Sequence, residues 1–129
     1  MVERRKYKRL EISVPLRMIL LGVFGSSPPV KAHTRNVSLE GLSIGLQEIE
    51  SALTLTSYLV LDKNEVALEI KIPPEGKRIR ATGKVVWYDE LGSREESYYL
   101  RAGVVLKEME TEDRIGWLDF ARNIASSKG

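Results

Sequence analysis

Alternation of apolar and polar residues dominates this sequence and limits the chain to a fold built mainly of strands. Apolar residues occupy positions 10, 12, 14 and 16, a period of two that is typical of a strand with one buried face. Further short runs with strand character follow, separated by Gly, Pro and Asn-containing turns. The predicted strands cover residues 10–24, 30–37, 41–49, 53–61, 65–72, 78–89 and 98–109. The pattern predicts a closed antiparallel barrel or a sandwich.

Three segments of the chain depart from the strand pattern or connect its strands. The segment 48–53, "EIESAL", is compatible with a helical turn just before the predicted strand 53–61. Residues 62–64, "DKN", predict a hairpin turn, and residues 90–97, "ELGSREES", predict a loop.

The C-terminal segment changes its period. Thr111 is a suitable helix cap, and Glu112 and Asp113 suit the positive end of a helix dipole. Apolar residues then recur at spacings of three and four, on one face of the predicted helix. These are Trp117, Leu118, Ala121, Ile124 and Ala125. We therefore expect a single domain with a polar arm at 1–9, a barrel at 10–110 and a helix at 111–127.

Composition excludes several kinds of chemistry. The 129 residues include no cysteine, so disulfides, zinc–thiolate sites and a thiol nucleophile are excluded. With His33 as the one histidine, neither a Ser-His-acid triad nor a multi-histidine metal site is expected. The longest apolar run, 18–24, is too short to span a membrane, so we expect a soluble, cytoplasmic protein. Without a Ser-His-acid arrangement or a phosphate-binding Gly-rich loop ahead of a helix, an enzyme is not expected.

Positive charge is concentrated at the start of the chain, although the net charge is only +2. The segment "RRKYKR" includes Arg4, Arg5 and Arg9. A solvated charge run explains such a segment when it is taken alone. An anion-binding arm also explains it, because guanidinium groups form paired hydrogen bonds with phosphate or with guanine O6 and N7, and stack on purines.

A second motif is "NVSLEG", which contains Asn36, Ser38 and Gly41. Plain turn chemistry accounts for it if Asn and Ser bond to nearby backbone and Gly adopts a positive φ. In the functional interpretation, the carboxamide and hydroxyl bind a base or phosphate, and Gly allows close approach of a ligand.

The order of these motifs resembles that of the PilZ domain family. The family pattern is RxxxR on an N-terminal arm, here Arg5 and Arg9, followed by [D/N]xSxxG, here Asn36, Ser38 and Gly41. "GKVVWYD" and "LRAGVVLKEMETEDRIGWLDFARN" continue the similarity. It covers nearly the whole chain, except that residues 48–64 fit least well and resemble an added element.

The resemblance implies a six- to seven-stranded PilZ-type β-barrel with a C-terminal helix, which binds cyclic di-GMP. It implies that the arm closes over the ligand and that a downstream protein recognises the new surface. Asn36, unlike Asp, is not a pure acceptor, which leaves the guanine contact weaker or differently oriented. Arg4 suggests by the same resemblance that a stacked pair of ligands is bound. Further candidate contacts are Arg35, Gly103 and Trp87.

Other interpretations remain open at this point. A basic-arm nucleic-acid binder is disfavoured because no row of exposed aromatic residues is evident. A PilZ-like interaction module without ligand is disfavoured by the intact motifs. Core packing is the favoured role for Trp87 and Trp117. No cofactor or metal is expected, a ligand role for His33 is disfavoured, and a homodimer is compatible with the sequence.

Overall fold

The computed structural model describes residues 10–22, 25–73, 76–95 and 98–128. Their strands are β1 (Leu10–Glu11), β2 (Pro15–Gly22), β3 (Gly25–Ser26), β4 (Val30–Val37), β5 (Gly41–Leu46), β6 (Glu65–Ile72), β7 (Lys77–Glu95) and β8 (Tyr98–Glu108). The two helices among these residues are α1 (Ile49–Leu59) and α2 (Thr111–Lys128).

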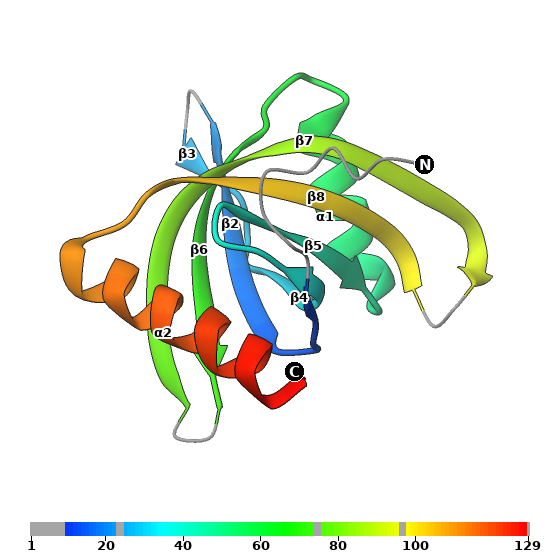
Figure 1. Cartoon of the computed structure of the whole chain (residues 1–129). Coiled ribbons are helices and arrows are strands. Elements are labelled where there is room, and N and C mark those ends of the chain that lie inside the picture. Colours follow the sequence, from blue (N-terminus) through cyan, green and yellow to red (C-terminus); the bar gives the residue numbers. More distant parts are fainter. Residues whose placement is uncertain (1–9, 23–24, 74–75, 96–97, 129) are drawn as a thin grey trace.

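Six of the described strands close into an antiparallel barrel. Their order around the ring is β2-β4-β5-β8-β7-β6, and pairing of β2 with β4 closes it. The short strand β1 pairs with β4, and β3 pairs with β2. In Figure 1 the long β7–β8 hairpin, in yellow and gold, reaches beyond the other strands. The prediction of an antiparallel barrel followed by a C-terminal helix is confirmed.

The alternation along each strand determines which side chains fill the barrel. On β5, for example, Leu42, Ile44 and Leu46 are buried in the core cluster. Because side chains alternate across a strand, Ser43 and Gly45 face outward. The largest fully buried aliphatic side chains are Met18, Leu20, Ile44, Leu46, Leu55, Ile70, Ile79 and Leu100.

Helix α2 packs on the barrel through the described part of the predicted stripe, which does not include the side chain of Ala125. Trp117, Ala121 and Ile124 are buried, Leu118 is half-buried, and Phe120 adds a buried ring beside Trp117, with ring centroids 5.7 Å apart. This helix (orange to red) and α1 (green) lie on different sides of the barrel in Figure 1. Of Trp87 and Trp117, only Trp117 fills the core, since Trp87 is 39% exposed.

Helix α1 replaces the strand predicted at 53–61. Its buried residues Ser51, Ala52, Leu55 and Leu59 lie on one helical face, a spacing of three and four that outweighs the β-branched composition. The hydroxyls of Thr54 and Ser57 bond to the carbonyls of Glu50 and Leu53, four residues earlier. The turn at 62–64 therefore follows a helix, and Asp62 in it has a φ of 60°.

The loop predicted at 90–97 is strand as far as Glu95, and residues 96–97 lie outside the described residues. β7 continues to Glu95, and Glu95 pairs with Tyr98 of β8. Glu90 pairs with Leu100 and Glu95 with Tyr98, with an irregular register between them, and this pairing at both ends outweighs the polar, turn-forming composition of the segment. Residues 25–26, in the connection between the predicted strands 10–24 and 30–37, form β3 against the end of β2.

Candidate functional site

The end of β4 carries a bulge that places the first residue of the second motif. Thr34 pairs with Ile44 and Asn36 pairs with Ser43, so Arg35 is the extra residue of an irregular register. Bulges commonly redirect side chains next to functional sites. After the bulge Val37 is fully buried in the core, and Asn36, half-buried, faces outward.

Asn36, which also pairs with Glu11 on β1, lies in a row of directly paired residues that continues across four strands. Asn36 on β4 pairs with Ser43 on β5, Ser43 pairs with Gly103 on β8, and Gly103 pairs with Trp87 on β7. Their neighbours Val37, Leu42 and Val104 face the core, so the row lies on the outside of the barrel. We call the outer surface of β4, β5, β8 and the second half of β7 around this row the motif face.

The turn between β4 and β5 is closed by Ser38 and Gly41. The Ser38 N–H donates to the Gly41 carbonyl at 2.8 Å, and the Ser38 hydroxyl donates to the same oxygen at 3.2 Å. The Ser38 carbonyl accepts a hydrogen bond from Trp117 Nε1 at 3.1 Å. Ser38 therefore holds the turn and ties it to α2, which is the turn chemistry expected of such a motif.

Gly41 is required for a different reason than the one expected from turn chemistry. Positive φ values occur at Gly25 and Gly76 among the described glycines, and Gly41 is not among them. A Cβ at Gly41 would lie 2.6 Å from the Val104 carbonyl oxygen. The close approach of β5 to β8 therefore excludes any side chain at this position.

Gly103 makes room for Trp87. A Cβ at Gly103 would lie 2.0 Å from Trp87 Nε1 and 2.5 Å from its Cε2. The indole thus occupies the space directly over Gly103, although 39% of Trp87 remains exposed. A partly exposed aromatic ring on the motif face is suited to stacking on a base.

Sequence reasoning missed two polar residues of the motif face. Arg101 on β8 donates to Asp89 Oδ2 at 2.6 Å, and it pairs across the sheet with Gly45, which pairs with His33. Ser43 is buried with 5% of its surface exposed. Spacing could have found both, because Arg101 precedes Gly103 by two residues and Ser43 follows Gly41 by two, which places each pair on one face of a strand.

The arginines of the first motif, Arg4, Arg5 and Arg9, lie outside the described residues. Within the part of the chain that is described, Asn36, Ser43, Gly103 and Trp87 lie in one row, with Arg35 at the adjacent bulge. The same described part contains no group of three or more carboxylate or histidine side chains arranged to hold a metal ion. Its helices also include none with the length and apolar character of a membrane span.

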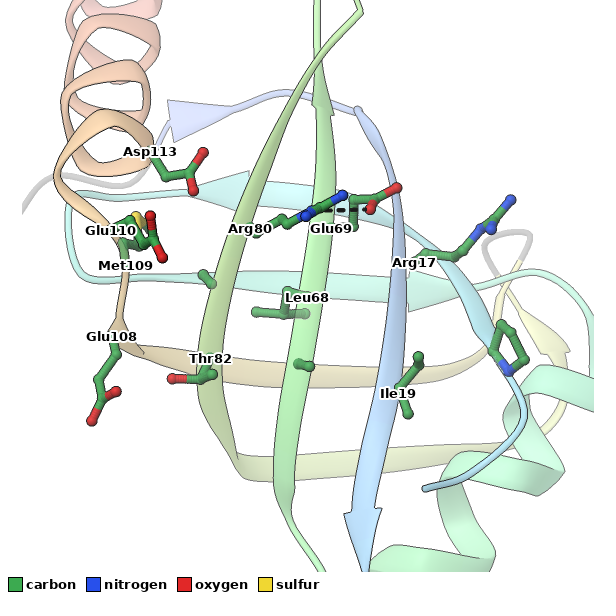
Figure 2. Close-up of a pocket in the computed structure, with 13 residues that line it drawn as sticks. Arg17, Ile19, Leu68, Glu69, Arg80, Thr82, Glu108, Met109, Glu110 and Asp113 are labelled. Atoms are coloured by element: carbon green, nitrogen blue, oxygen red, sulfur yellow. Dashed lines mark ion pairs between the residues drawn. The ribbon is translucent and has the colours of Figure 1, made fainter. Parts of the chain in front are cut away.

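A groove lies on another part of the barrel, over β2, β6 and the first half of β7. Its volume is about 650 Å³, and Figure 2 shows Arg17 and Ile19 of β2 on one side, with Glu110 and Asp113 near the start of α2 on the other. Glu69 lies between them and pairs with Arg78 at 3.4 Å and with Arg80 at 3.6 Å. We call this surface the groove face. In the ring order, β2 and β6 stand opposite β8 and β5 of the motif face.

The PilZ domain family model matches residues 3–120, so the chain belongs to the PilZ domain family. The match begins ahead of the first described residue and includes Arg4, Arg5 and Arg9. No curated protein sequence is significantly similar to this chain.

Solved structures of PilZ proteins share the fold. The PilZ domain of YcgR from Escherichia coli, solved with c-di-GMP, has a TM-score of 0.66 and 11% identity, and the match covers 98% of this chain and 95% of that one. The inhibitor of motility MotI/DgrA of Bacillus subtilis has a TM-score of 0.66 and 14% identity over 99% of this chain and 54% of that chain.

A third structure, the PlzA protein of Borreliella burgdorferi in complex with c-di-GMP, has a TM-score of 0.60 and 12% identity. This match covers 95% of the present chain and 52% of PlzA. The chain thus spans about half the length of MotI/DgrA and of PlzA. At these identities the likeness shows a shared fold.

Proposed function

We propose that this protein is a receptor for cyclic di-GMP and has no catalytic role. The observation that carries the proposal is the row on the motif face, in which Asn36 of the second motif lies in line with Ser43, Gly103 and Trp87. Membership of the PilZ family and the c-di-GMP complexes of YcgR and PlzA support the choice of ligand.

Residue roles follow from the chemistry of a ligand with two guanines and two phosphates. Arg5 and Arg9, on the proposed arm at 1–9, bind phosphate and the O6/N7 edge of guanine. Asn36 binds a guanine edge, and Ser38 and Gly41 keep the turn in place beside it. These roles combine a charged clamp with a polar platform on the barrel.

Four further residues complete the proposed contacts. Arg4 binds a second, stacked ligand molecule, and Arg35 at the bulge contacts a phosphate. Trp87 stacks on a guanine, and Gly103 leaves space for its ring. Closure of the arm over the ligand creates a surface that a downstream protein recognises, because binding orders one conformation over others.

Calorimetric titration of the full chain with cyclic di-GMP tests the proposal. We expect saturable binding that is lost in Arg5→Ala and in Arg9→Ala. Arg17→Ala is the matched control, because it removes the same charge from the groove face and should leave the affinity unchanged. Absence of binding by the unmodified protein at high micromolar ligand would refute the proposal. If the protein instead binds nucleic acids of many sequences, with an affinity that falls steeply as the salt concentration rises, the nucleic-acid alternative is favoured.

A further inference from the structure

Four polar side chains are buried in the described part of the chain, and they differ in their hydrogen bonding. The Ser27 hydroxyl accepts from Leu20 N and donates to Pro28 O, and Thr34 Oγ1 accepts from Val14 N and donates to Ile12 O. Ser51 Oγ accepts from Lys31 N at 3.1 Å. Within the described residues, Ser43 Oγ has no hydrogen-bond partner, which sets it apart from the other three.

A buried hydroxyl without a partner is unfavourable, because it loses its bonds to water and gains none in return. Folded proteins satisfy most such groups, so an exception calls for an explanation. Ser43 lies on the outward side of β5, directly opposite Asn36 on one side and Gly103 on the other. Its hydroxyl is therefore placed where the proposed ligand would approach the barrel.

We propose that the Ser43 hydroxyl accepts a hydrogen bond from the exocyclic 2-amino group of the guanine that Asn36 binds. This inference rests on the proposed function. Directly paired residues on one face of antiparallel strands have Cβ atoms about 4.5–5.5 Å apart, so both side chains can contact one base.

The guanine edge explains why a second acceptor is needed. Its Watson–Crick edge offers one acceptor, O6, and two donors, N1–H and the 2-amino group. A carboxamide supplies one acceptor and a donor group, so Asn36 can satisfy O6 and N1–H together. The 2-amino group then still needs an acceptor, and a carboxylate at position 36 would have supplied a second oxygen. The hydroxyl of Ser43 replaces that oxygen.

Access to Ser43 requires a neighbouring group to move, since its Oγ is buried. Trp87 is the partly exposed side chain beside it in the row, and its indole occupies the space over Gly103, the direct partner of Ser43. The register around Trp87 is irregular, between Val85 and Trp87. A turn of the indole away from Gly103 opens the surface next to the hydroxyl.

The experiment compares Ser43→Ala with the unmodified protein, using cyclic di-GMP and cyclic di-IMP as probes. Cyclic di-IMP lacks the 2-amino group and is otherwise the same ligand. We expect calorimetry to show that Ser43→Ala weakens cyclic di-GMP binding by about fivefold to tenfold, the loss of one hydrogen bond. The affinity for cyclic di-IMP should be equal in the two proteins.

Thermal unfolding without ligand supplies a second readout. Ser43→Ala should leave the midpoint unchanged or raise it, because the substitution removes an unsatisfied buried hydroxyl. Ser51→Ala is the matched control. It removes a buried hydroxyl that has a partner, so it should lower the midpoint and leave ligand affinity unchanged.

Each other outcome has a distinct meaning. Equal cyclic di-GMP affinity in Ser43→Ala and the unmodified protein overturns the inference and leaves the proposed function standing. Equal losses for both probes, or a clear drop in thermal midpoint without ligand, also overturn it, since the hydroxyl would then act on another group or on folding. No binding of either probe by the unmodified protein overturns the proposed function and this inference with it.

Discussion

The motif face and the groove face are both built from antiparallel strands, yet they differ in how their polar side chains are paired. On the groove face, Glu69 pairs with two arginines, and charged side chains border an open hollow (Figure 2). On the motif face, two glycines allow close packing, and a buried hydroxyl lies without a partner among the described residues. The two faces therefore differ in how fully their polar side chains are paired.

The largest expected difference between the faces is in how much stability is lost when a small side chain is enlarged. Gly41→Ala on the motif face should lower the free energy of unfolding by about 2–3 kcal/mol, because the new Cβ meets the Val104 carbonyl oxygen. Ala67→Val on the groove face adds more atoms at an open site and should change stability by about 0.5 kcal/mol or less. Urea unfolding measures both, and equal stability of Gly41→Ala and the unmodified protein would remove this distinction.

A second comparison concerns aromatic stacking. Trp87→Ala should weaken cyclic di-GMP binding by about tenfold or more, since stacking of a base on an aromatic ring contributes about 1–3 kcal/mol. Ile19→Ala removes an apolar side chain from the groove face and should leave the affinity unchanged. Calorimetry measures the affinity of both variants. An unchanged affinity in Trp87→Ala would show that the indole covers Gly103 and does not stack on the ligand.

Asn36→Ala tests the proposed hydrogen bonds to guanine on the motif face. Loss of its two hydrogen bonds to guanine should weaken cyclic di-GMP binding by about tenfold to twentyfold. Thr82→Ala, which removes an exposed hydroxyl from the groove face, serves as the control and should bind as the unmodified protein does. If both variants bind with equal affinity, the row across the four strands is not the site.

The smallest effects are expected where the two faces are alike. Asp89→Asn breaks the ion pair with Arg101 on the motif face, and Glu69→Gln weakens two pairs on the groove face. Each should cost less than about 1 kcal/mol of stability, and less still at high salt, because these pairs are solvent-accessible. Thermal unfolding at two salt concentrations measures this, and a large, salt-independent loss on either face would contradict it.

Sequence reasoning reached the barrel because apolar residues alternate in most of its strands, and α2 because a capping Thr111 and acidic first turn precede apolar residues at spacings of three and four. It missed α1, where the helical spacing of Ala52, Leu55 and Leu59 is overlaid by threonines that favour strands. It also ended β7 too early, because the strand reaches Glu95 through pairing of Glu90 and Glu95 with β8. Local composition carries no information about such a partner.

The candidate site was predictable in part. The second motif marks Asn36, Ser38 and Gly41 by residue type and spacing alone. Ser43 and Arg101 escaped notice because a lone serine or arginine in a strand is unremarkable until the register shows what lies beside it. The exposure of Trp87 depends likewise on a glycine sixteen positions away, Gly103.

The hydrogen bond from the Trp117 indole to the Ser38 carbonyl joins residues 79 positions apart. Through this bond α2 supports the turn between β4 and β5. A displacement of α2 from the barrel would therefore also displace that turn. A C-terminal truncation that removes Trp117 would thus disturb the β4–β5 turn as well as the packing between α2 and the barrel.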